Sequence, residues 1–117
     1  PWFEYYKDSL LELYQRPYAF LVDWNLACFE WAVAQIGRMD LAISLTSSFQ
    51  ATYNLEEYLD LRNKILPGNY HQETGPKYRQ VFEEKWGFFP NLSILDLLFC
   101  EGKRAGEILW PGGNSDE

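Results

Sequence analysis

Two residue types that support specialised chemistry are scarce in this 117-residue sequence. Its two cysteines, Cys28 and Cys100, are too few for the disulfide framework of a small secreted protein, so we expect reduced, buried thiols in a cytoplasmic protein. The one histidine, His71, has no paired cysteines to complete a zinc site, so we expect no metal site. No sequence feature indicates a particular cofactor.

Positive charge and long apolar runs are also scarce. Ten Lys and Arg residues stand against 17 Asp and Glu, which gives a net charge of −7 and argues against a nucleic-acid partner held by phosphate contacts. The most apolar run, 92–99, is far shorter than the roughly 20 residues of a membrane span and contains Asp96. The first residues show no export signal.

Aromatic residues, at 18%, are unusually abundant. The length allows one hydrophobic core, so we expect a single helical domain over 1–110 and a flexible polar tail over 111–117. The expected core aromatics are Phe3, Tyr6, Phe29, Phe82 and Phe99. The five tryptophans lie near element ends or away from the apolar stripes: Trp2, Trp24, Trp31, Trp86 and Trp110. Such a surplus indicates a surface that another segment covers, and the start on Pro1 without an initiator Met suggests a longer protein whose N-terminal half is missing.

Helical spacing of apolar residues predicts most of the secondary structure. A capping residue is expected at Asp23 and at Asn54, and stops are expected at Pro17, Gly37 and Gly87. The expected helices span 2–14, 23–36, 55–65, 77–85, about 93–102 and 105–110. We expect a mobile loop over 70–76.

Alternating apolar and polar residues over 39–46 predict a half-buried β-strand. A strand needs a neighbour, which could be residues 49–53, the missing half or a second copy of the chain. The expected fold is therefore a mainly α, compact multi-helix domain with one or two short β-strands, part of a larger α/β or α+β protein. An open edge at 39–46 would be a site of self-association.

Asp60 and Arg62 are polar residues inside an apolar pattern. On a helix, two positions apart, they would point to different sides and would not pair directly. Arg62 suits a substrate carboxylate or phosphate, because its planar guanidinium binds such groups bidentately. A structural salt bridge to Asp96 or Asp60 is the alternative.

Asp96 lies in the most apolar run of the chain. A carboxylate there needs a helix end or a cation to offset its burial. Ser93, three residues earlier, gives the spacing of a capping box, so a capping role is the structural interpretation. The functional interpretation is that Asp96 acts as a base or as an orienting carboxylate.

Several segments of the chain match the pattern of one protein family. The most specific is Asn91-Leu92-Ser93-Ile94-Leu95-Asp96-Leu97-Leu98-Phe99, and the others are Tyr78-Arg79-Gln80-Val81-Phe82-Glu83, Gly87-Phe88, Glu101-Gly102, Phe3-Glu4-Tyr5-Tyr6, Asn25-Leu26 and Asp60-Leu61-Arg62. Together these segments resemble the C-terminal half of the WbqC-like family. Lys103 stands where that family's proline is expected. The resemblance implies a bacterial protein about twice this length, associated with O-antigen or other surface-polysaccharide biosynthesis, but it supplies no catalytic residues.

Two functions are compatible with these patterns. The first is an enzyme, for example a group transferase, that acts on a sugar or amino-sugar precursor. There Arg62 would anchor an anionic group, and Asp60 or Asp96 would be the base. The side chains expected to bind the sugar are Tyr78, Gln80, Asn91 and Ser93. The second is a non-catalytic helical module that binds the missing N-terminal half or a partner protein.

Overall fold

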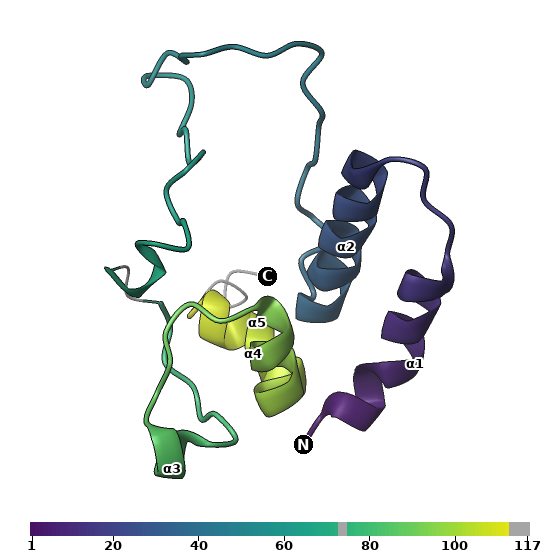
Figure 1. The fold of residues 1–117 in the computed structure, drawn as a ribbon, viewed down its shortest axis with the longest axis vertical. Coiled ribbons are helices and arrows are strands. Elements are labelled where there is room, and N and C mark those ends of the chain that lie inside the picture. Colours follow the sequence, from purple (N-terminus) through teal and green to yellow (C-terminus); the bar gives the residue numbers. More distant parts are fainter. Residues whose placement is uncertain (73–74, 113–117) are drawn as a thin grey trace.

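A computed structural model describes residues 1–72 and 75–112. The helices are α1 (Phe3–Gln15), α2 (Leu21–Ile36), α3 (Glu83–Trp86), α4 (Ile94–Glu101) and α5 (Ala105–Leu109), with short 3-10 turns at Tyr70–Gln72 and Gly102–Arg104. Helices α1 and α2 run in opposite directions, and both contact α4 (Figure 1). The segment between α2 and the Tyr70–Gln72 turn arches away from the helices without regular structure (Figure 1).

The first two helices form where the apolar spacing predicts them. In α1, Tyr6 and Leu13 are buried on one face, and the helix ends before Pro17 at the extended residue Arg16. Gly37 ends α2 in the left-handed conformation, with φ of +79°. The predicted cap at Asp23 is wrong, because α2 begins two residues earlier and Asp23 lies in its first turn.

Helix α4 supplies the centre of the core. Ser93 is its N-cap, and the Ser93 hydroxyl accepts a hydrogen bond from the backbone N–H of Leu95 at 3.1 Å, so the predicted start is confirmed. Leu97 and Leu98 are buried against Tyr6 of α1 and Ala105 of α5. The core therefore joins segments nearly one hundred residues apart in the sequence.

Close backbone packing holds the C-terminal helices in place. The added Cβ of an alanine at Gly106 would overlap the carbonyl oxygen of Ile36, so α5 lies directly on the end of α2. Gly102, with φ of +61°, lies under the ring of Trp2 and leaves no room for a Cβ. Both contacts need glycine.

The predicted β-strands are wrong, since none forms within residues 1–72 and 75–112. Residues 39–46 and 49–53 are irregular and do not pair. An isolated strand cannot satisfy its backbone groups, so without a neighbour the alternating pattern is insufficient. Without a strand at 39–46 there is no open strand edge, so the expected self-association through that edge has no structural basis.

The predicted helix over 55–65 is also absent. Asn54 starts a single turn, in which its carbonyl oxygen accepts from the N–H of Tyr58 at 2.9 Å, and the chain then extends. Asn63 has φ of +61°, which no helix residue adopts. Short helices need tertiary packing on their apolar face, and here no core lies behind the segment.

The helix predicted over 77–85 shrinks to the four residues of α3, Glu83–Trp86. Residues 75–80 have no regular secondary structure, and the buried side chain of Gln80 bonds to the backbone of Phe89. The predicted last helix is confirmed as α5. Part of the predicted 70–76 loop, 73–74, and most of the predicted tail, 113–117, lie outside the described residues.

Much of the aromatic and aliphatic surface stays exposed. Tyr6 is 1% exposed, but Phe3, Phe29 and Phe82 are 47%, 50% and 67% exposed, contrary to the expected core. The chain exposes 9669 Å², whereas a folded protein of 13.8 kDa exposes about 6,600 Å². Its radius of gyration, 16.4 Å, compares with about 13 Å for a folded domain of this length.

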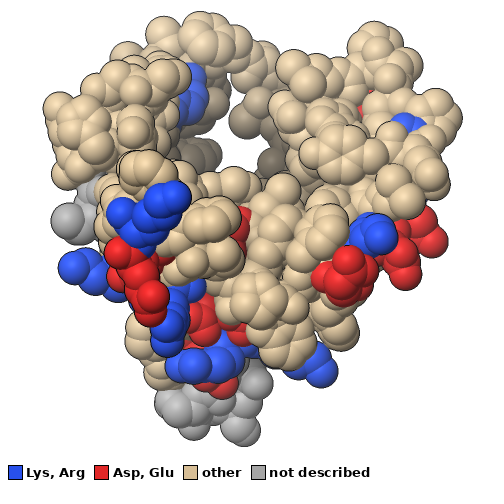
Figure 2. Space-filling model, turned by 60° about the horizontal axis from the view of Figure 1, so that its bottom comes forward, with Lys and Arg blue, Asp and Glu red and all other residues tan. Residues whose placement is uncertain are grey.

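Figure 2 shows one face on which uncharged residues predominate and charged residues gather along the lower part. Within the described part of the chain, no helix combines the length and apolar character needed to cross a membrane.

Candidate functional site

Three of the predicted site residues meet beside α4. The Tyr78 hydroxyl donates to Asp96 Oδ2 at 2.6 Å, and Gln80 Nε2 donates to the Tyr78 hydroxyl oxygen at 3.3 Å. Asp96 comes from the first turn of α4, whereas Tyr78 and Gln80 come from the extended segment before α3. The fold thus gathers a carboxylate, a phenol and an amide from two segments.

Gln80 is the buried anchor of this cluster, with 7% of its surface exposed. Its Nε2 also donates to the Phe89 carbonyl at 2.7 Å, and its Oε1 accepts from the Phe89 N–H at 2.9 Å. Both polar atoms of the amide therefore bond within the protein. Gln80 positions Tyr78 and Phe89, and both of its N–H donors are used within the protein, so only the second lone pair of Oε1 remains for a ligand.

Burial, followed by the hydrogen bond to Asp96, raises the pKa of Tyr78 to about 12. The phenol therefore keeps its proton and acts as a donor to Asp96 at neutral pH. Burial, with the Asp96 charge second, also raises the pKa of the Cys100 thiol. A thiol with a raised pKa is a weak nucleophile, which favours a structural role for Cys100.

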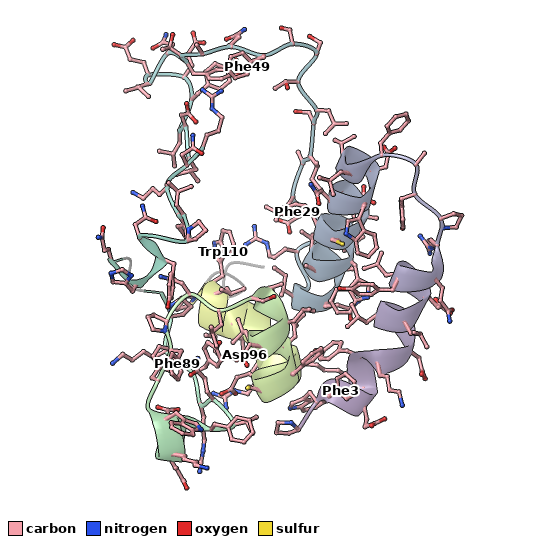
Figure 3. The ribbon with its side chains drawn as sticks, in the orientation of Figure 1. Phe3, Phe29, Phe49, Phe89, Asp96 and Trp110 are labelled. Atoms are coloured by element: carbon pink, nitrogen blue, oxygen red, sulfur yellow. The ribbon has the colours of Figure 1, made fainter. Side chains whose placement is uncertain are left out.

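Asp96 borders a hollow of about 400 Å³ between the chain start, α3 and α4. Aromatic rings dominate its lining: Phe3, Phe82, Trp86, Phe89 and Phe99. Figure 3 shows Phe3 and Phe89 on the two sides of the region around Asp96. Sequence analysis placed Phe3, Phe82 and Phe99 in the core and missed this hollow, although the run Gly87-Phe88-Phe89-Pro90 beside the apolar helix was a signal.

The predicted capping box is only half formed. Ser93 caps α4, but the Asp96 carboxylate bonds to Tyr78 instead of returning to the helix start. The Ser93 hydroxyl is thus used to cap the N-terminus of α4. Asp96 keeps its second oxygen, Oδ1, free of hydrogen bonds to the described residues.

Asp60 and Arg62 form a separate cluster in the irregular segment. Arg62 Nη2 lies 2.7 Å from Asp60 Oδ2, so the structural alternative of a salt bridge to Asp60 forms, and the expectation from helix geometry that the two residues would not pair is wrong. The same guanidinium donates to the carbonyls of Gln50 at 2.7 Å and Ala51 at 3.2 Å, and its Cζ lies 4.8 Å from the Tyr53 ring centroid. Arg62 therefore fastens two parts of the segment together.

The candidate residues do not share one pocket. Asp60 and Arg62 border a cavity of about 490 Å³ with Tyr53 and Tyr58, while Asp96 borders the aromatic hollow. Arg62 lies near Phe49, which Figure 3 shows at the opposite end of the ribbon from Asp96. Asn91 borders a third cavity and donates through Nδ2 to the Tyr70 carbonyl at 2.5 Å.

No metal-binding group of three or more His, Cys, Asp and Glu side chains occurs among the residues that the structure describes. His71 lies in the 3-10 turn Tyr70–Gln72, with its ring edge-on to Tyr70 at 5.5 Å between centroids.

Comparison with known proteins returned no match to any family model, curated protein or solved structure. The function is therefore inferred from the geometry and the sequence of the chain itself.

Proposed function

We propose that this chain is a helical interaction module that completes its hydrophobic core by packing against a second polypeptide segment. The observation that carries the proposal is the exposed surface of 9669 Å², about 3,000 Å² above that of a folded protein of this mass. A stable protein–protein interface buries about 800 Å² on each partner, so the excess is large enough for an extensive interface.

The chemistry of this surface supports a polypeptide partner. Tyr and Trp side chains typify the central contacts of interfaces, and Tyr5, Tyr14, Tyr58 and Trp86 are each more than half exposed. A second copy of the chain would bring together two net charges of −7. Electrostatics therefore favours a partner that is neutral or basic.

The resemblance to WbqC-like proteins supports the N-terminal half of that family as the covering segment. On this proposal the assembled protein serves surface-polysaccharide biosynthesis in the cytoplasm. A group-transfer site for a sugar precursor would belong to the assembly, because the candidate residues of this chain lie in separate cavities.

Co-purification with the separately expressed N-terminal half of a WbqC-like protein tests the packing. We expect a 1:1 complex by light scattering, with amide exchange slowed around Phe82 and Trp86. Failure of the two to associate at 100 μM, roughly the weak end of specific interfaces, contradicts the proposal.

A thermal-shift screen of the complex with nucleotide sugars and acyl donors tests the link to polysaccharide synthesis. A ligand that binds the folded state raises the melting temperature. Absence of any shift across the panel argues against a sugar-processing role and leaves the packing result intact.

A further inference from the structure

The aromatic hollow beside Asp96 has the composition of a cation site. Among its twelve lining residues, five are Phe or Trp, and Asp96 is the one carboxylate. Aromatic faces carry negative electrostatic potential and attract cations. The ring of Trp86 already contacts a cation, since the Lys85 amino group lies 5.0 Å from its centroid.

Asp96 lines the hollow and has one carboxylate oxygen, Oδ1, available for a ligand. Tyr78 holds Oδ2 at 2.6 Å and fixes the carboxylate, while Oδ1 accepts no hydrogen bond from the described residues. The second hydrogen bond of Tyr78, from Gln80, fixes the phenol in turn. The carboxylate is thus held in one orientation, with Oδ2 hydrogen-bonded and Oδ1 without a hydrogen bond from the described residues.

No Lys, Arg or His side chain lines the hollow in the described part of the chain. Pro1 lines it, but its terminal amine forms no ion pair with Asp96 within 4.0 Å. A carboxylate in apolar surroundings is stabilised by a paired cation. The hollow is therefore complementary to a positive charge on an apolar stem.

We infer that the hollow receives an arginine side chain of the covering polypeptide, with Asp96 as its counter-ion. This inference rests on the proposed packing of a second segment. Arginine fits better than lysine, because its planar guanidinium stacks on aromatic rings and binds a carboxylate through parallel N–H groups. The methylene stem would contact Phe82 and Phe99, which line the same hollow.

Benzamidine, a planar aromatic amidinium, and benzamide, its neutral analogue, are the probes for the isolated chain. We expect benzamidine to bind about tenfold more tightly in an NMR titration, with shifts at the Trp86 indole and the Asp96 amide. The Asp96→Asn variant keeps the acceptor for Tyr78 and removes the charge, so it should lose that preference. Glu107→Gln, an exposed change on α5, is the matched control and should leave both affinities unchanged.

Equal binding of benzamidine and benzamide, or a preference that survives Asp96→Asn, overturns the inference. In the complex with the N-terminal half, the arginine should occupy the hollow and reduce benzamidine binding at least tenfold. If the complex forms and benzamidine still binds it as tightly as it binds the free chain, the inferred arginine is rejected, but the proposed packing of the two segments is not. If no complex forms, the packing proposal fails and the inferred arginine with it, while the titration of the free chain still reports whether the hollow selects cations.

Discussion

At the scale of single residues, the charged groups Asp60, Arg62 and Asp96, each set among apolar neighbours in the sequence, all have a polar partner in the structure. Asp60 pairs with Arg62 because the segment is not helical: Asp60 Oδ1 accepts from the backbone N–H of Arg62 at 3.1 Å, a local turn that brings the two side chains together. Asp96 pairs with Tyr78, eighteen positions earlier. Residue type indicated that each group needed a partner, and the path of the chain decided which one.

The hydroxyl of Tyr78 should contribute measurably to stability. Tyr78→Phe leaves Asp96 Oδ2 and one Gln80 N–H without their partner, so we expect a loss of about 1–3 kcal/mol in the free energy of unfolding by urea. Tyr5→Phe is the control, since Tyr5 is exposed and its hydroxyl forms no hydrogen bond in the described structure. Equal effects of the two changes would show that the cluster around Asp96 adds nothing.

Asp60 should titrate at unusually low pH. The hydrogen bonds from the Arg62 side chain and backbone lower the pKa of Asp60 from 3.8 to about 2. A lowered pKa means that the contact is fully present above pH 3.8 and is lost as the pH falls through 2. We expect the Asp60 carboxyl carbon to titrate near pH 2 by NMR and to return toward 3.8 in Arg62→Gln; a midpoint near 3.8 in the unmodified chain excludes the pair.

At the scale of elements, helices formed where an apolar face met another helix. The stripes of α1, α2 and α4 each contact one of the others, whereas the equally periodic segment 55–65 has no neighbour and is not a helix. The intrinsic helix preference of so short a segment is too weak to form a helix in water without packing. Periodicity therefore identified candidate elements, and tertiary contact selected among them.

Gly106 should be essential for the junction of α2 and α5. Gly106→Ala forces a methyl group into the carbonyl of Ile36, and such overpacking costs about 1–3 kcal/mol. The matched control is Gly68→Ala, where the added methyl group meets no atom within 4 Å. We expect thermal unfolding to show a lower midpoint for the first variant and little change for the second; similar midpoints would refute close packing of α5 on α2.

The cap of α4 gives a second prediction at this scale. Ser93→Ala removes the acceptor for the Leu95 N–H and should destabilise the chain by about 1 kcal/mol. Ser93→Asp restores an acceptor and should recover that stability. Hydrogen exchange at the Leu95 amide distinguishes the variants, and identical exchange in all three would mean that the cap is dispensable.

At the scale of the whole molecule, the large exposed surface is the observation on which the proposed function rests. The described core is small, with six buried hydrophobic residues centred on Tyr6 and Leu98, and the segment after α2 adds no further buried hydrophobic side chain until α4. An arrangement of this kind gains stability when a partner removes more apolar surface from water.

Solution scattering should report this openness directly. For the free chain we expect a radius of gyration near 16 Å, compared with about 13 Å for a folded domain of equal length. The exposed aromatic surface should also increase the fluorescence of a hydrophobic dye, and the N-terminal half should suppress that increase. A value near 13 Å for the chain alone would mean that the arching segment folds back on the helices and needs no partner.

The sequence alone predicted where α1, α2, α4 and α5 lie, with the Ser93 cap and the Gly37 stop, because caps, stops and apolar spacing are local features of the chain; packing then decided which of the candidate helices formed. It also indicated an aromatic surplus beyond what one small core holds. Only the tertiary structure decided that 39–46 is no strand and that Arg62 is tied to Asp60. It likewise decided that Asp96 faces an aromatic hollow. Strand pairing, ion pairing and cavities depend on segments far apart in sequence, and local spacing does not encode which of them meet.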